Sequence, residues 1–105
     1  MTYHSYHSTY ELAVRTTGPL QYMVIFQPYA PGAAEVVLHA FSTEDEAIRA
    51  AKAFPERYQL AVVRGYVLEQ SYFIHSSGKA IHVSFAMDLS ISNEKFRHIL
   101  DPADA

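Results

Sequence analysis

The chain contains no cysteine and no tryptophan, and only 4 of its 105 residues are glycine. Without cysteine the chain has no disulfide, no thiolate nucleophile and no cysteine-ligated zinc or iron centre. Because small secreted domains are often held together by disulfides, we expect a cytoplasmic protein. The four glycines are isolated from one another, so the sequence predicts no glycine-rich phosphate loop.

Basic residues and long apolar runs are also scarce. The net charge is −3, and the 8 Lys and Arg residues are scattered along the chain. Nucleic-acid binders usually carry a basic stripe, and the order of elements differs from the βαββαβ order of an RRM, so we favour no nucleic-acid partner. No run approaches the ~18 apolar residues that cross a bilayer, and the first residues do not resemble a signal peptide. We therefore expect no membrane partner.

The amino-acid composition indicates a globular protein. Hydrophobic residues make up 50% of the chain and charged residues 18%, a balance typical of one folded domain over residues 1–105. Eight Tyr and six Phe are a high aromatic content for this length. Aromatic residues favour sheets and are common in contact surfaces.

The first half of the chain predicts three strands. Residues 1–8 have no clear period and are predicted to form a loose, flexible arm. Alternating apolar residues over 10–15 indicate a half-buried strand. The nearly continuous apolar run over 20–27 indicates a central strand that is covered on both faces. A third strand is predicted over 35–41, after a segment broken by two prolines and a glycine.

Two helices are predicted from their caps. Thr43 with Glu46 three residues later forms a capping box, and carboxylates fill the first turn of the helix that follows. This main helix is expected over about 43–54, because Pro55 is predicted to end it. Ser92 caps a short C-terminal helix over about 93–100.

The segment 66–89 predicts a β-hairpin with a defined register. Ser77 and Gly78 are predicted to form a two-residue turn between two alternating runs. The apolar face then pairs Ile74 with Ile81 and Tyr72 with Val83. The opposite face pairs His75 with Ala80 and Phe73 with His82. A slip of one residue would set apolar side chains against polar ones, so the pattern favours this register.

These elements predict an α+β fold. We expect an antiparallel sheet of about five strands, with one main packing helix and the short C-terminal helix. Residues 58–75 are too long for one straight strand, because they would span roughly 60 Å. Arg64 and Gly65 must therefore interrupt the strand, either as a bulge or as a tight turn.

The histidines are the candidate metal ligands. In the predicted register His75 and His82 are diagonal neighbours on one face, where two imidazoles can share an ion or repel each other when protonated. A zinc site needs a third or fourth ligand, for which Glu69, His39 and His98 are the candidates. The alternative is that both histidines are simply outward-facing polar residues.

The candidate partner-binding residues are aromatic residues and histidines, namely Phe73, His75, His82, Tyr3 and Tyr6. The first three share the predicted outward face of the hairpin, and the two tyrosines lie in the arm. No catalytic residues are assigned, because the sequence has no nucleophile elbow and no carboxylate pair that burial would activate. No cofactor is predicted.

The sequence therefore predicts a small non-enzymatic protein–protein interaction module. It would act as a regulator or inhibitor, such as those that phages and mobile elements encode, by binding a partner protein or a second copy of itself as a homodimer. The alternative is a metal- or small-ligand-binding domain that uses the histidines of the 66–89 hairpin. A third hypothesis is an enzyme whose pocket is built from scattered residues.

Overall fold

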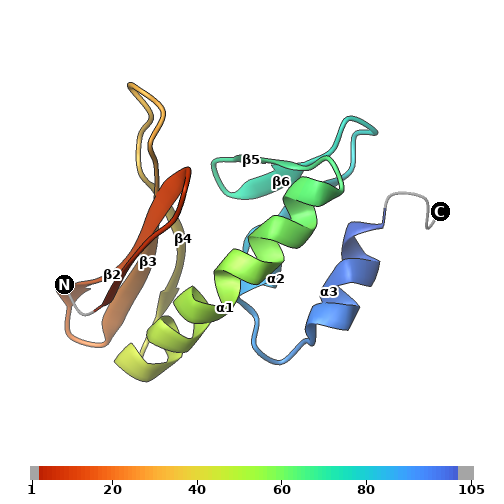
Figure 1. Cartoon of the computed structure of the whole chain (residues 1–105). Helices are drawn as coiled ribbons and strands as arrows, with labels where there is room; N and C mark the ends of the chain where they lie inside the picture. The colour runs from red at the N-terminus through yellow and green to blue at the C-terminus, as the bar shows by residue number, and fades with distance from the viewer. Residues whose placement is uncertain (1–2, 102–105) are drawn as a thin grey trace. The chain divides into compact units, whose positions relative to one another are not determined.

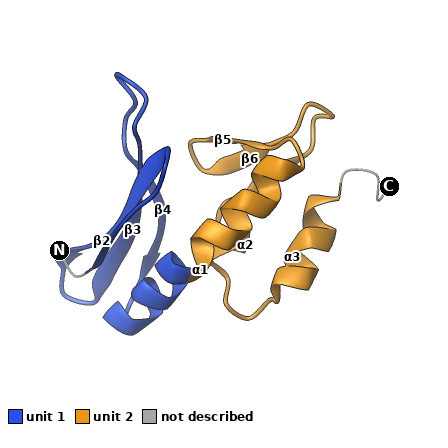
Figure 2. Ribbon diagram, viewed as in Figure 1, with its two compact units in different colours: residues 1–52 blue, residues 53–105 orange. Residues whose placement is uncertain are grey.

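The computed structural model describes residues 3–101 and divides the chain into two compact units, 1–52 and 53–105 (Figure 2). One helix, α1 (Glu44–Val63), contributes residues to both units. The fold is α+β with antiparallel sheets, as predicted. The expectation of a single domain stays a prediction.

The first unit contains a four-stranded antiparallel sheet in chain order (Figure 1). Its strands are β1 (Tyr3–Tyr6), β2 (Tyr10–Gly18), β3 (Gln21–Pro28) and β4 (Val36–Phe41). The three predicted strands correspond to β2, β3 and β4. The predicted central strand, β3, lies between β2 and β4, which explains its continuous apolar run.

The predicted loose arm is wrong for residues 3–6, which form the edge strand β1. Tyr3 lies opposite Val14 of β2, and Tyr6 lies opposite Glu11. Sequence patterning missed this strand because only four residues pair, too few for an alternation to be recognised. Residues 1 and 2 of the predicted arm lie outside the described residues.

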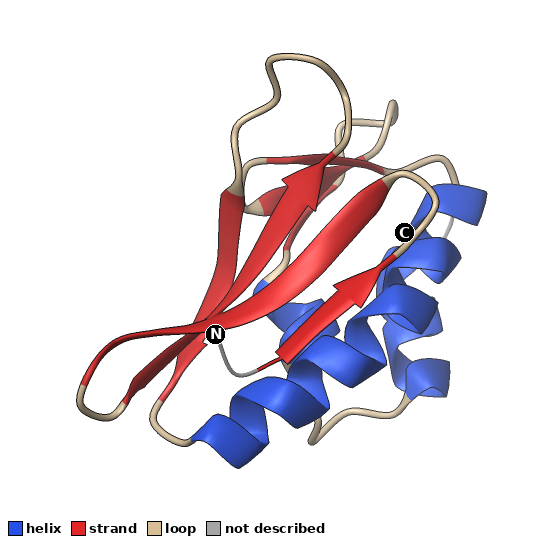
Figure 3. Cartoon of the chain, turned by 60° about the vertical axis from the view of Figure 1, so that its left-hand side comes forward, coloured by secondary structure: helices blue, strands red, loops and turns tan. Residues whose placement is uncertain are grey.

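One face of this sheet is apolar and covered within the first unit. Its central residues, Leu12, Val14, Val24 and Phe26, are buried. Tyr3 lies on the same face, and the Nζ atom of Lys52 in α1 is 5.9 Å from the centre of its ring. The first turns of α1 therefore pack on this face, as Figure 3 shows.

Helix α1 begins as the sequence predicts. The Thr43 hydroxyl accepts a hydrogen bond from the Glu46 backbone N–H (3.2 Å) and donates one to the Glu46 carboxylate (2.9 Å). The predicted end of the helix is wrong, because α1 continues through Pro55 to Val63. A proline inside a helix removes only one backbone hydrogen bond, and the buried side chains beyond it, Arg57 and Ala61, favour continuation.

The helix ends at Arg64 and Gly65, which the sequence placed in a bulge or tight turn of a strand. Gly65 has a φ of +87°, and its N–H donates to the Val62 carbonyl (3.0 Å). The Tyr66 N–H donates to the Ala61 carbonyl (3.0 Å). These two bonds form a Schellman motif, in which glycine is the preferred residue because its φ is positive. Residues 58–63 are thus helix and not strand.

The second unit contains its own three-stranded antiparallel sheet, formed by β5 (Val67–Glu69), β6 (Tyr72–Ile74) and β7 (Ala80–His82). The predicted single sheet of about five strands is therefore replaced by separate sheets of four and three strands. The predicted hairpin exists as β6 and β7, but it is shorter than 66–89, because residues 84–87 form the helical turn α2 (Ser84–Met87).

The register of this hairpin differs by one residue from the prediction. Ile74 pairs with Ala80, and Phe73 pairs with Ile81. The connection has three residues, Ser76 to Gly78, because the His75 N–H donates to the Lys79 carbonyl (2.9 Å) and Gly78 has a φ of +98°. A turn that ends in a left-handed glycine is the usual form of a three-residue hairpin loop.

The shift exchanges the two faces of β6, whereas those of β7 stay as predicted. Phe73 and Ile81, which share a face in this register, are buried, whereas Tyr72 and Ile74 are exposed. The Phe73 ring packs 6.3 Å from the ring of Tyr58 in α1, which in turn stacks on Phe54. The residue that the sequence placed on an outward face therefore belongs to the core of the second unit.

The C-terminal helix α3 (Asn93–Leu100) confirms the predicted range, and the Ser92 hydroxyl caps it by accepting from the Lys95 N–H (3.0 Å). Its buried residues are Phe96 and Leu100. The Tyr66 hydroxyl donates a hydrogen bond to the Leu100 carbonyl, which ties the end of α3 to the residue before β5.

A buried arginine joins α1 to the segment between α2 and α3. Arg57 is 4% exposed and donates hydrogen bonds from all three guanidinium nitrogens. Nε donates to the Asn93 side chain (2.8 Å), and Nη2 donates to the Ile91 carbonyl (2.5 Å). Nη1 donates to the carbonyls of Asp88 (2.8 Å) and Phe85 (3.2 Å). The guanidinium satisfies carbonyls that no strand or helix would pair.

Burial lowers the pKa of Arg57, while the carboxylates of Asp88 and Glu56 act in the opposite direction. The same residue, Glu56, accepts a hydrogen bond from the Asn93 amide (2.8 Å). Adjacent residues of α1 thus hold both ends of the Asn93 side chain, and the first residue of α3 is fixed against α1.

We predict that Arg57→Ala lowers the free energy of unfolding by about 3 kcal/mol or more, because it leaves several buried carbonyls without a donor. The matched control is Arg49→Ala in the same helix. Arg49 is exposed and pairs with Asp45, so its loss should cost about 0.5 kcal/mol or less. Chemical denaturation of both variants measures the difference, and equal effects would contradict the role assigned to Arg57.

We also predict that Pro55→Ala stabilises the protein. Alanine restores the backbone N–H that proline lacks inside α1, and the gain should be about 1–3 kcal/mol. The midpoint of thermal unfolding should rise. A lower midpoint would show that the packing around α1 depends on the helix geometry that proline imposes.

Candidate interaction surfaces

The sheet of the second unit has one uncovered face, which we call the open face. It carries alternate residues of the three strands in two rows that run across them. Val67, Ile74 and Ala80 form one row of directly opposed residues. Glu69, Tyr72 and His82 form the other row.

The open face is apolar and accessible to solvent. The exposed fractions are 60% for Val67, 47% for Tyr72 and 36% for Ile74. Ala80 beside Ile74 is exposed as well. Single exposed apolar residues are ordinary, but neighbouring ones on adjacent strands form a patch, and such patches mark interaction sites. Sequence analysis missed Tyr72 and Ile74 because the predicted register turned them inward.

His82, a predicted partner-binding and metal residue, lies on the open face and is half-buried. Its ring packs edge-on against Tyr72 at 5.1 Å. The Nδ1 atom accepts a hydrogen bond from the Ser84 backbone N–H (3.1 Å) and lies 2.8 Å from the Ser84 hydroxyl. Because Nδ1 is an acceptor, the neutral ring carries its proton on Nε2. The open face therefore has an imidazole N–H donor in its polar row.

His75, the other predicted ligand, lies on the opposite side of the sheet. By alternation along the strand it shares the side of Phe73, and its ring lies beside the buried Tyr66 at 5.0 Å. Its Nδ1 atom accepts from the Ser77 backbone N–H (3.0 Å) and lies 2.9 Å from the Ser77 hydroxyl. His75 and His82 thus use the same local His-x-Ser arrangement on different faces.

The structure separates the two histidines of the predicted metal site. The register that made His75 and His82 neighbours on one face is replaced by one that separates them. In both residues Nδ1 is already an acceptor for a backbone N–H, which holds the remaining proton on Nε2 and opposes metal binding there. Among residues 3–101, no group of three or more His, Asp or Glu side chains is arranged to hold an ion.

The predicted contact residue Phe73 is fully buried, so it is not available to a partner. The two tyrosines of the predicted arm have different surroundings. Tyr3 lies on the covered face of the first sheet beside Lys52, whereas Tyr6 is 72% exposed. Of the five predicted contact residues, Tyr6 is exposed, Phe73 is buried, and Tyr3, His75 and His82 are half-buried.

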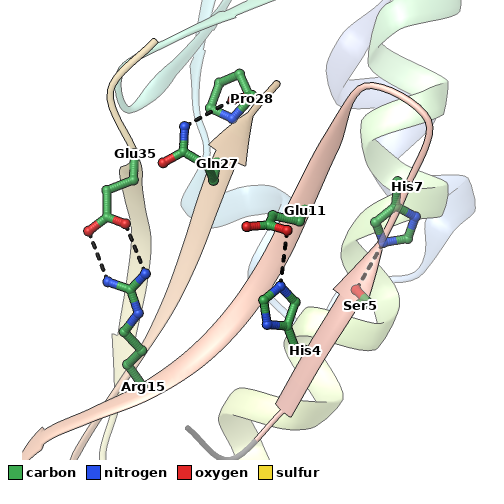
Figure 4. Close-up of polar contacts among 8 residues, drawn as sticks. All are labelled: His4, Ser5, His7, Glu11, Arg15, Gln27, Pro28 and Glu35. Atoms are coloured by element: carbon green, nitrogen blue, oxygen red, sulfur yellow. Dashed lines mark hydrogen bonds and ion pairs between the residues drawn. The ribbon is translucent and has the colours of Figure 1, made fainter. Parts of the chain in front are cut away.

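Tyr6 belongs to a polar and aromatic cluster on the second face of the first sheet, part of which Figure 4 shows. Its ring stacks on His4 with 4.4 Å between centroids, and the His4 Nε2 atom lies 3.2 Å from the Glu11 carboxylate. Tyr29 is also near, since the carboxylate of Glu11 and the phenol of Tyr6 add to the effect of burial in raising its pKa. This cluster is a second accessible surface with exposed aromatic groups.

A bidentate ion pair lies on the same sheet face. Both guanidinium NH₂ groups of Arg15 donate to the Glu35 carboxylate at 2.9 Å (Figure 4). The hydrogen bonds from Arg15 lower the pKa of Glu35 below its usual value of 4.5. The pair joins β2 to the residue before β4 and fixes the start of that edge strand.

No protein-family model, curated protein or solved structure matches this chain. Within the described part of the chain, no helix is long and apolar enough to cross a membrane.

We predict that the Ser84 amide depends on the His82 ring for its hydrogen bond. In His82→Phe the Ser84 N–H loses the Nδ1 acceptor, so this amide should exchange with solvent faster than in the wild type. The Ser77 amide, which donates to Nδ1 of His75, is the matched control and should keep its wild-type rate in this variant. Amide exchange followed by NMR measures both rates, and an unchanged Ser84 rate would contradict the assigned hydrogen bond.

A second titration tests the ion pair on the first sheet. We expect Arg15→Gln to raise the pKa of Glu35 toward 4.5, because the lowering comes chiefly from Arg15. A carboxylate with a lowered folded pKa stabilises the protein above its unfolded pKa, and the contribution is lost as the pH falls through the folded pKa. The wild-type advantage over the variant should therefore be present at neutral pH and amount to less than about 1 kcal/mol, because the pair is exposed. It should disappear as the pH falls through the lowered folded pKa of Glu35.

Proposed function

We propose that this chain is a small non-enzymatic protein-interaction module that acts as a regulator or inhibitor by binding a partner protein through the open face of β5, β6 and β7. The observation that supports the proposal is the row formed by Val67, Ile74 and Ala80, which is apolar, exposed and continuous across three strands. Burying such a row removes apolar surface from water, which is the main favourable contribution to protein association.

The second row supplies the polar groups that an interface needs for specificity. Tyr72 presents a rigid aromatic ring with a hydroxyl, a residue type common at the centre of interfaces. Glu69 offers a carboxylate on one side of it and His82 an N–H donor on the other. An apolar row beside a polar row that contains both a donor and an acceptor resembles the core and rim of a binding patch.

The face is supported from behind by a packed core. Phe73 and Ile81 alternate with the exposed residues and are buried, and Phe73 contacts Tyr58 of α1. Side chains on a sheet held in this way lose little further conformational freedom when a partner binds. The open face therefore presents its residues in a fixed arrangement.

We expect Ile74→Asp to abolish binding of the partner, because it places a charge at the centre of the apolar row. The matched control is Leu20→Asp, at a position in the first unit that is 76% exposed. Tagged wild-type protein and both variants are used to capture binding proteins from cells that express the chain. A partner retained by the wild type and the control but lost from the Ile74 variant supports the proposal, and equal retention by all three contradicts it.

A further inference from the structure

We infer that the open face of the second unit binds the open face of a second copy of this chain. The two copies are related by a two-fold axis that lies between these open faces and runs parallel to β6. The inference rests on the proposed use of the open face and names its partner. It comes from the order of the residues in the two rows. The two-fold rotation brings the first residue of each row over the last residue of the same row in the second copy, and these residues are complementary.

A two-fold axis parallel to β6 places β5 of one copy over β7 of the other. In the polar row, Glu69 of each copy then faces His82 of the other, and the two Tyr72 side chains meet at the axis. The His82 Nδ1 atom accepts from the Ser84 N–H, so the Nε2–H donor is free to bind the carboxylate of Glu69 in the second copy. The contact occurs twice, as a two-fold interface requires.

The apolar row is complementary under the same rotation. Val67 of each copy faces the small Ala80 of the other, while the two Ile74 side chains pack against each other at the axis. Large residues therefore meet small ones at the edges of the face, and the bulk of the contact lies at the centre. This is the arrangement in which two identical surfaces pack without a clash or a void.

The other in-plane axis, perpendicular to the strands, does not give this match. It would set Glu69 of each copy over Val67 of the other and leave His82 over Ala80, so each carboxylate would be buried against an aliphatic side chain. The charge pattern therefore selects the axis along β6. The interface is small, because three strands of three residues each form the face. We expect a weak dimer, with a dissociation constant of about 10 µM to 1 mM.

The first test is sedimentation velocity of the full chain over a range of concentrations up to about 1 mM. The wild type and Leu20→Asp should change reversibly from monomer to dimer, and Ile74→Asp should stay monomeric at every concentration. A wild-type chain that remains monomeric throughout this range overturns the inference. If Ile74→Asp still abolishes capture of another protein in that case, the proposed function stands with a different partner.

The second test uses charge exchange to establish the axis. Glu69→Arg and His82→Glu should each weaken self-association by at least about tenfold, because each puts like charges or two donors opposite one another. An equimolar mixture of the two variants should form heterodimers. In one contact of the heterodimer the two substituted positions face each other with opposite charges, and in the other contact the native His82 faces the native Glu69. Restored association also shows that both variants are folded. Failure of the mixture to associate more strongly than either variant alone would overturn the proposed axis.

Discussion

Four hydrogen bonds from one buried guanidinium hold the segment between α2 and α3 in place. Residues 88–92 have no regular secondary structure of their own, and three backbone carbonyls between Phe85 and Ile91 turn toward Arg57. Carbonyls in the interior need a donor, and a single arginine supplies several with fixed geometry. The position of α3 follows from this contact, because Asn93 binds both Arg57 and Glu56.

The same interaction explains why α1 is longer than its sequence suggests. Pro55 is a strong stop signal when the segment is considered alone. The residues that follow it, however, include Arg57, Tyr58 and Ala61, each of which contributes to the interior of the second unit. The start of α1 at Thr43 is determined by local contacts and was predicted correctly. Its end depends on tertiary contacts that the sequence does not reveal, so the prediction placed it nine residues too early.

The predictable features of this chain are the ones that local chemistry determines. The caps at Thr43 and Ser92 and the alternation in β2 predicted elements that the structure contains. The candidate site was harder to predict because it depends on register, and one extra residue in the loop before Lys79 exchanged the faces of β6. The left-handed Gly78 was the available signal, since glycine ends three-residue loops as well as two-residue ones. The predicted metal site of His75 and His82 depended on the same register, and the register in the structure puts the two residues on different faces.

Helix α1 continues through Pro55, which lacks a backbone N–H, and its residues belong to two compact units. Ala47, Ala50 and Ala51 are buried in its first half, and Phe54, Arg57 and Ala61 in its second. A unit that lost its tertiary packing would leave half of α1 without support, and an isolated helix of ten residues is marginal in water. Local opening of either unit should therefore fray the half of α1 that this unit buries, so that the amides of that half exchange with solvent as the unit opens.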